Sequence, residues 1–167
     1  GKVTVENYLQ YFKVKHGLES TSFRIANPYG PRQQKHRKQG VIPIFLEKSI
    51  SGEPVTVFGD GTMIRDYIFV KDVADMMVAT LDTQPSFDVY NLGSGVGNSV
   101  TEVIQAIEIA TDKPLSVEYN TQVPSTFVHT SILDSERYFA EFGHRDVVQL
   151  KEGIQRTYEE LRKELEN

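Results

Sequence analysis

The sequence predicts a single α/β domain, and three observations support that fold class. Short β-prone segments alternate with segments whose apolar residues recur at helical spacing, as in folds where helices cover a sheet. The length of 167 residues suits one domain with a sizeable core. Hydrophobic residues make up 39% and charged residues 25% of the chain, which is the balance of a globular protein rather than of a disordered one.

The pattern predicts the following order of elements. Helical periodicity covers residues 2–16, 41–51, 71–81, 99–111 and 150–165, and a short helix is expected between Asp134, as its cap, and Gly143. Strands are expected at 21–26, 55–58, 65–70, 88–92 and 115–119, with a further one at 131–133. Residues 27–31, Asn-Pro-Tyr-Gly-Pro, are expected to form a turn or loop because they hold two prolines and a glycine.

Glycines and capping residues set several of these boundaries. Gly17 and Gly52 stand where glycine ends a helix, and Ser99 with Glu102 three residues later forms a capping box. The first helix is expected to carry one apolar face, made of Val5, Tyr8, Leu9 and Phe12. The helix at 71–81 is expected to bury Val73, Met76, Met77 and Thr80.

Composition excludes several classes of function. The absence of cysteine excludes disulfides, a thiol nucleophile and a thiolate metal site. A net charge of −5 and a pI near 5.4 argue against sequence-independent nucleic-acid binding. The longest apolar run, residues 41–46, is too short for a membrane span. The four histidines are isolated, and serine, histidine and aspartate occur in no nucleophile-elbow context, so neither a metal hydrolase nor a serine hydrolase is expected. We therefore expect a soluble, cytoplasmic protein without nucleic-acid or membrane partners.

A Gly-x-Gly turn at Gly93 and Gly95 follows one predicted strand and precedes a predicted helix, as a dinucleotide-binding loop would. The fingerprint needs a third glycine or an alanine for close helix–strand packing, and Asn98 occupies that place. We therefore favour a tight strand–helix turn over a phosphate-binding loop.

Arg65 and Asp66 are adjacent in a predicted strand that is otherwise apolar. One interpretation is a structural ion pair between neighbours. Side chains of successive strand residues point to opposite faces, however, which disfavours that pair. Arg65 is then expected to project into a cleft, where its planar guanidinium group suits a phosphate.

Two further polar groups come at the end of the first predicted strand. Arg24 and Asn27 lie where ligands bind in open α/β sheets, although Asn27 is equally suited to end the strand through a side-chain turn. The basic cluster at 35–38 is expected to be a solvated surface, the alternative being an electrostatic attraction for an anionic ligand.

Taken in order, these segments resemble the C-terminal half of an extended short-chain dehydrogenase/reductase, in the group of UDP-glucose 4-epimerases and nucleotide-sugar dehydratases. The resemblance covers nearly the whole chain: residues 1–6 are similar to the end of the family's Tyr-Gly-x-x-Lys motif and its continuation, residues 24–31 to Arg-x-x-Asn-x-Tyr-Gly-Pro, residues 57–61 and 65–73 to the sugar-nucleotide domain, and residues 91–95 and 150–154 complete the order. The resemblance implies late strands of a parallel Rossmann-type sheet plus a small mixed α/β substrate-binding subdomain. Residues 1–167 are then one fragment of a longer chain whose NAD-binding part lies upstream.

The same resemblance implies the cofactor, NAD or alternatively NADP, and a nucleotide-sugar partner, most simply a UDP-sugar. Lys2 is the implied catalytic lysine, which binds the nicotinamide ribose and lowers the pKa of a tyrosine four residues earlier. Ile25 and Ala26 are implied to lie near the nicotinamide. Asn27 and Arg65 are implied to hold the pyrophosphate, and the pocket for the base and ribose is implied to be lined by Gly40, Val41, Thr56, Val57 and Phe58.

The sequence departs from the family's pattern in three places. The glycine-rich NAD loop and the catalytic tyrosine with its Ser/Thr partner are not within residues 1–167, so these residues alone are not expected to catalyse. Residues 124–127, Pro-Ser-Thr-Phe, stand where related enzymes carry Arg-x-x-Asp, and losing that arginine's contact with the pyrophosphate costs about 1.5–3 kcal/mol. Lys71 stands where the family often has an acidic residue.

An epimerase is the favoured hypothesis within this group, with a dehydratase, a reductase or a decarboxylase as alternatives. A hypothesis of a different class is a non-catalytic domain that binds nucleotide sugars. A third is a fragment that folds only in part, since its strands would lack parallel partners. The resemblance also implies that the helix containing Lys2 forms a homodimer interface, the alternative being that its apolar face belongs to the core of the intact subunit.

Overall fold

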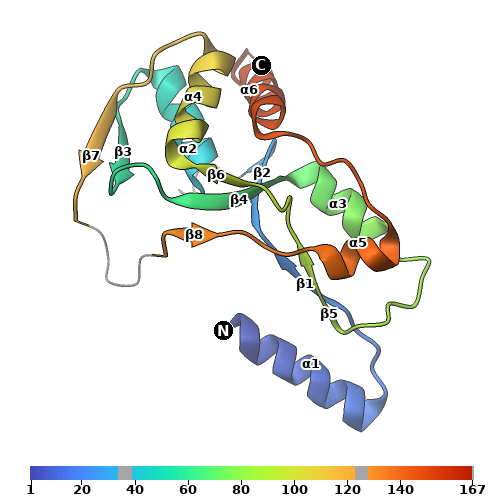
Figure 1. Ribbon diagram of the computed structural model, residues 1–167. Coiled ribbons are helices and arrows are strands. Elements are labelled where there is room, and N and C mark those ends of the chain that lie inside the picture. The colour runs from blue at the N-terminus through green and yellow to red at the C-terminus, as the bar shows by residue number, and fades with distance from the viewer. Residues whose placement is uncertain (34–38, 123–127, 167) are drawn as a thin grey trace.

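The computed structural model describes residues 1–33, 39–122 and 128–166 and confirms the α/β fold class (Figure 1). The elements follow the order α1 (Lys2–His16), β1 (Ser22–Ile25), β2 (Asn27–Tyr29), α2 (Val41–Ser51), β3 (Val55–Phe58), β4 (Ile64–Phe69), α3 (Val70–Val78), β5 (Val89–Leu92), β6 (Gly97–Ser99), α4 (Val100–Thr111), β7 (Val117–Asn120), β8 (Thr130–Ser131), α5 (Glu136–Phe142) and α6 (Leu150–Glu166). All the expected helices and strands are present, with ends shifted by up to three residues.

The strands form three small groups. β1 pairs in parallel with β5, and the chain then passes through Ala26 alone into β2, which pairs in parallel with β4. β4 also pairs antiparallel with β6 and parallel with β8, while β3 pairs in parallel with β7. The chain therefore crosses from one sheet to the next at a single residue.

The expectation of a turn at 27–31 was wrong for its first three residues, which form β2. Pro28 lacks an N–H group and cannot donate to a strand ladder, but among the described strands β2 pairs with β4 alone. A proline is tolerated on such an edge strand. The short strand β6 was also not expected, because its segment follows a glycine-rich turn.

Two hydrophobic clusters hold the elements together. The larger one lies between α2, α4, α6 and the strands β3 and β4, and its fully buried members include Leu46, Val55, Val103, Ile107 and Ile154. The smaller one joins β4, β5, α3 and α5. Val73, Met76 and Thr80 are buried as the sequence predicts, whereas Met77 is 39% exposed.

Helix α1 stands apart from both clusters, and none of its residues is buried (Figure 1). Its predicted apolar face is open within this chain, since Val5, Tyr8 and Phe12 are 58%, 63% and 43% exposed. Polar contacts attach it to the β1–β5 pair: Lys13 Nζ lies 2.5 Å from Asp88 Oδ1, and Arg24 of β1 binds Glu6 through both Nε and Nη2.

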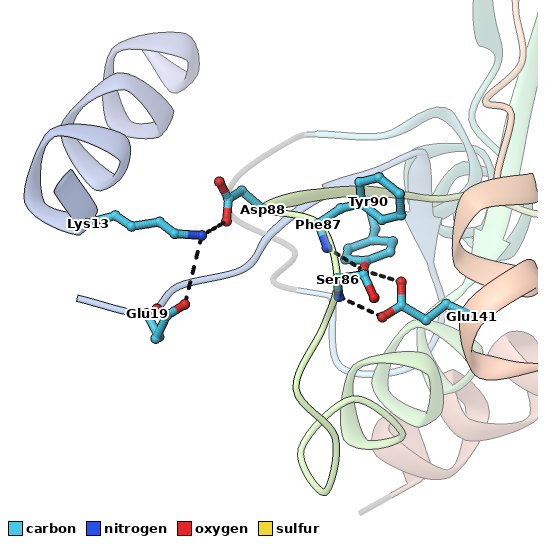
Figure 2. A network of polar contacts seen from close by, with 7 residues as sticks. All are labelled: Lys13, Glu19, Ser86, Phe87, Asp88, Tyr90 and Glu141. Carbon is cyan, nitrogen blue, oxygen red and sulfur yellow. Dashed lines mark hydrogen bonds and ion pairs between the residues drawn. The ribbon is translucent and has the colours of Figure 1, made fainter. Parts of the chain in front are cut away.

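A second polar network lies beyond Asp88 (Figure 2). The hydroxyl group of Tyr90 donates to Glu141 Oε2 at 2.5 Å, and the backbone N–H of Ser86 donates to Glu141 Oε1 at 2.7 Å. Glu141 of α5 thus fixes the segment that leads into β5. No helix in the described part of the chain is long and apolar enough to cross a membrane.

Candidate functional site

A cavity of about 200 Å³ opens where β2 and β4 meet the start of α2. Four residues predicted to bind substrate line it together: Asn27 of β2, Arg65 of β4, and Gly40 and Val41 at the start of α2. Gly40 has a φ of 87°, a conformation that favours glycine, and it lets the chain enter α2 directly at the rim. The sequence motifs that contain these residues are separated along the chain, and the fold brings them to one wall.

Arg65 has a fixed guanidinium group. Its Nη1 donates to the carbonyl oxygens of Ile64 at 2.7 Å and His129 at 3.2 Å, and its Nη2 donates to that of Val128 at 2.6 Å. Its Nε–H has no acceptor among the described residues. These carbonyl oxygens orient the guanidinium group at the wall of the cavity, and no carboxylate of the described residues pairs with it. The alternative of an Arg65–Asp66 ion pair is wrong, because the two side chains have separate partners.

Asn27 is held across the sheet and does not form a local turn. Its Nδ2 donates to the backbone carbonyl of Asp66 at 2.8 Å, so the alternative that it ends a strand through its own side-chain turn is wrong. This bond uses one N–H of the amide. The amide oxygen and the second N–H have no partner in the part of the chain that the structure describes, and they remain for a ligand in the cavity.

Asp66 is 1% exposed, and its carboxylate accepts four hydrogen bonds. Oδ1 accepts from the N–H and the hydroxyl of Ser94 at 2.9 and 2.6 Å. Oδ2 accepts from the N–H groups of Gly95 and Leu133, each at 3.2 Å. The donors compensate for the burial of the charged group.

These bonds explain the Gly-x-Gly sequence. The N–H groups of Ser94 and Gly95 point at the carboxylate of Asp66, so they do not form an open site for an external phosphate. A Cβ atom at Gly93 would overlap Asp66 Oδ2 and lie 2.9 Å from Leu133 Cβ. The prediction of a tight turn is therefore confirmed.

The residues implied to face the cofactor lie on two elements. α1 runs antiparallel to β1, because Glu6 lies beside Arg24 while Lys13 lies beside Asp88, which precedes the start of β5. Lys2 is one helical turn before Glu6, about 6 Å further toward the carboxyl end of β1. Ile25 and Ala26 occupy that end, and Ala26 N–H donates to the Leu92 carbonyl at 2.9 Å.

This arrangement fits a dinucleotide at the strand ends. Ligands of open α/β sheets bind beyond the carboxyl ends of parallel strands, where Ala26 lies. Ile25 is 40% exposed, so it has surface available for a planar ring. The roles of Lys2, Ile25 and Ala26 remain predictions.

Two tyrosines that the sequence reasoning did not assign also line the cavity, Tyr29 and Tyr67. Burial raises the pKa of Tyr67 to about 12 and raises the pKa of Tyr29 further. Both phenols are therefore protonated near neutral pH and are poorly suited to accept a proton. Tyr29 belongs to the Arg-x-x-Asn-x-Tyr-Gly-Pro segment and Tyr67 to residues 65–73, two of the segments that carry the resemblance, and this was the signal that could have identified them.

Other predicted residues lie outside the cavity wall. Val57 is 2% exposed and belongs to the core, while Thr56 and Phe58 lie on the exposed face of β3. Arg24 is paired with Glu6. Lys71 forms an ion pair with Asp75 at 2.5 Å on the surface of α3. The basic cluster at 35–38 and residues 124–127, where the sequence departs from the family's pattern, lie outside the described residues. Beside the cluster, the side-chain amide of Gln33 donates to the Gln39 carbonyl at 3.0 Å.

Comparison with known proteins gives a consistent result. Residues 1–93 match the NAD dependent epimerase/dehydratase family. The chain is 34% identical over 161 residues to dTDP-4-dehydro-6-deoxyglucose reductase of Escherichia coli, covering 96% of this chain and 51% of that protein. It is 36% identical over 162 residues to UDP-glucose 4-epimerase of Mycolicibacterium smegmatis, covering 97% of this chain and 51% of that protein.

Solved structures show the same relationship. UDP-glucose 4-epimerase from Thermotoga maritima, determined with UDP-glucose, superposes with a TM-score of 0.87 at 35% identity. The match covers 98% of this chain and 52% of that one. The chain thus spans about half the length of the relatives it matches.

Proposed function

The chain belongs to the NAD dependent epimerase/dehydratase family, and on that premise we propose that it is the substrate-binding half of a nucleotide-sugar epimerase. The observation that carries the proposal is the cavity in which Asn27, Gly40, Val41 and Arg65 meet. The family is enzymatic and NAD-dependent. The epimerase activity, the UDP-sugar substrate and the binding of NAD by the whole protein are the proposed parts.

At the substrate end, Arg65 and Asn27 hold the pyrophosphate. The guanidinium group of Arg65 is fixed by three main-chain carbonyls, and its positive charge and its Nε–H, which has no acceptor among residues 1–33, 39–122 and 128–166, suit a phosphate oxygen. The Asn27 amide supplies a neutral donor beside it. Gly40 and Val41 line the same cavity and are assigned to the base and ribose.

At the redox end, Lys2, Ile25 and Ala26 face the nicotinamide half of NAD. NAD, when bound, supplies a ring that takes up a hydride from the sugar and returns it. The ammonium group of Lys2 binds the ribose hydroxyls, and its charge lowers the pKa of a neighbouring phenol. The backbone at Ile25 and Ala26 sets the position of the ring relative to the sugar.

The proton-accepting phenol is placed by resemblance four residues before Lys2, outside residues 1–167. The pKa values of Tyr29 and Tyr67 support that placement, because burial holds both cavity tyrosines in their protonated form. Their hydroxyl groups remain able to donate hydrogen bonds. We assign them to lining the cavity and not to acid–base chemistry.

The test uses the full natural protein that contains this chain. UDP binding is measured by titration calorimetry, and the interconversion of UDP-glucose and UDP-galactose is followed with bound NAD monitored by absorbance. We expect UDP to bind, both sugars to interconvert, and Lys2→Met to abolish interconversion while leaving UDP affinity unchanged. Absence of UDP binding would refute the substrate assignment. UDP binding with a net loss of water from the sugar would establish a dehydratase instead.

A non-catalytic domain that binds nucleotide sugars is the second candidate. One observation favours it: four of the proposed substrate-binding residues line one cavity, whereas none of the residues proposed to face the cofactor lines it. Separate titrations with UDP and with NAD distinguish the two candidates. Binding of UDP alone supports the second candidate, and binding of both supports the enzyme.

The exposed face of α1 supports a further part of the proposal. Val5, Tyr8 and Phe12 lie open within this chain although their spacing is that of a buried stripe. We assign this face to a homodimer interface, with the core of the intact subunit as the alternative. Sedimentation of the full protein and of Tyr8→Glu separates the two, since only an interface variant yields a folded monomer.

A further inference from the structure

Asp66 occupies the junction between the two ends of the proposed site. It lies in β4, directly after Arg65, and its backbone carbonyl accepts the side-chain N–H of Asn27. Asn27 follows Ala26, which ends the β1–β5 pair. Asp66 is thus connected to both proposed substrate-binding residues, to Arg65 through the chain and to Asn27 through a hydrogen bond.

The carboxylate of Asp66 connects two further segments, and its backbone a third. Ser94 and Gly95 follow β5, Leu133 follows β8, and Asp66 itself pairs with Gly97 of β6. These bonds span 28 to 67 residues of sequence. One buried side chain therefore fixes the connection after β5 and the connection after β8 to the same strand residue.

The connection after β8 leads back to Arg65. β8 pairs with β4 so that Ser131 lies opposite Arg65, and the carbonyls of Val128 and His129 just before it hold the guanidinium group. Asp66 anchors the other side of β8 through Leu133. Residues 128–133 therefore orient Arg65 at their start and are bound by the carboxylate of Asp66 at their end.

We propose that Asp66 is a positioning residue, which sets Arg65 and Asn27 relative to the carboxyl end of β1 through the hydrogen bonds of its buried carboxylate to Ser94, Gly95 and Leu133. This inference rests on the proposed function, because the positioned groups are those assigned to the pyrophosphate. Asp66 itself does not touch the ligand. The N–H groups of Ser94 and Gly95 in the Gly-x-Gly turn bind the carboxylate of Asp66.

The test compares three variants of the full natural protein. Asp66→Asn replaces one carboxylate oxygen with an NH₂ group, so two of the four donors lose their acceptor. These are either the N–H and the hydroxyl of Ser94, or the N–H groups of Gly95 and Leu133. Ser94→Ala removes the hydroxyl that donates to Asp66 Oδ1 and that also accepts from Val96 N–H at 3.1 Å, but it keeps the bond from Ser94 N–H. This variant remains informative if Asp66→Asn does not fold. Tyr138→Phe is the matched control, because it removes a buried 2.8 Å hydrogen bond to the Met76 carbonyl in the smaller hydrophobic cluster.

We expect Asp66→Asn to weaken UDP binding about tenfold or more, measured by calorimetry at a temperature where the variant is fully folded. Ser94→Ala is expected to shift the dissociation constant in the same direction by a smaller factor. Tyr138→Phe is expected to remain within about twofold of the parent, since the Tyr138 hydroxyl donates to the Met76 carbonyl and shares no partner with Asp66. Unchanged UDP affinity in Asp66→Asn, or in Ser94→Ala where the former does not fold, would overturn the inference. Equal weakening by Tyr138→Phe would also overturn it, since the effect would then follow stability alone.

Hydrogen exchange separates this inference from the proposed function. If the parent protein binds no UDP, the proposed function fails, and protection of the Ser94, Gly95 and Leu133 amides decides the role of Asp66. We expect Asp66→Asn to lose that protection while Tyr138→Phe keeps it. Unchanged protection in Asp66→Asn would overturn the inference independently of any ligand.

Discussion

The hydroxyl group of Tyr29 occupies the space that a side chain at position 153 would need. A Cβ atom at Gly153 would overlap the phenolic oxygen and lie 2.8 Å from Cζ of the ring. α6 therefore approaches β2 with bare backbone against an aromatic ring. Because Tyr29 also lines the cavity, the packing of α6 bears directly on the shape of the proposed site.

Gly153→Ala is expected to destabilise the protein by about 1–3 kcal/mol, because the added methyl group must displace a buried ring. The loss outweighs the gain in helix propensity, which is at most about 1 kcal/mol. Urea denaturation measures the change in the free energy of unfolding. Lys151→Ala, on an exposed position of the same helix, is the control and should stay within about 0.5 kcal/mol of the parent. A Gly153→Ala variant as stable as the control would contradict the close approach.

Arg65→Lys is expected to weaken UDP binding about tenfold, because a lysine keeps the charge but loses the planar set of donors. Titration calorimetry gives the dissociation constants. Arg137→Lys makes the same chemical change outside the cavity, where the guanidinium group lies over the ring of Phe87. Equal affinities for the two variants would remove Arg65 from the binding site.

Ser99→Ala is expected to cost about 1 kcal/mol of stability through loss of the α4 cap. The Ser99 hydroxyl accepts from Glu102 N–H at 3.1 Å, and Glu102 Oε2 accepts from Ser99 N–H at 2.7 Å. Thermal unfolding provides the measurement. Ser51→Ala is the control, since that hydroxyl only donates to a carbonyl at the exposed end of α2. Similar losses in the two variants would mean that the capping box contributes nothing specific.

The Tyr90–Glu141 hydrogen bond predicts a pH dependence of stability. The bond from Tyr90 holds the pKa of Glu141 below its usual value of 4.5. A carboxyl group with a lowered pKa in the folded state contributes stability above its unfolded pKa, and this is lost as the pH falls through the folded value. Glu141→Gln should therefore be less stable than the parent at pH 7, and the difference should shrink below about pH 4.5. A difference that does not change between pH 7 and pH 3 would show that the bond does not depend on the charge.

The sequence predicted the elements that depend on local signals. The capping box at Ser99, the glycine ends of α1 and α2, and the strand at 55–58 follow from neighbouring residues and were confirmed. β2 was not predicted, because Pro28 is locally typical of a turn. The segment forms a strand only because it pairs with β4 at the edge of the sheet.

The site could be predicted only in part, for a related reason. Separate motifs containing Asn27 and Arg65 suggested a common ligand, and the fold brings them to one cavity. The partner of Asp66 could not be read from the sequence, since the bonds to Ser94 and Leu133 join residues 28 and 67 positions apart. The same holds for Arg24, whose availability for a ligand depends on Glu6, a residue on another element.

The single residue between β1 and β2 restricts how this protein's length can vary. In an extended chain, side chains alternate between faces, so Asn27 and Tyr29 share a face that Pro28 does not. One residue inserted at Ala26 would place Asn27 where Pro28 stands and Pro28 where Tyr29 stands. The side chains of Asn27 and Tyr29 would then point away from Arg65 even though no residue had been substituted. Homologues that keep this site should therefore differ by substitution, but not by insertion or deletion, between Arg24 and Tyr29.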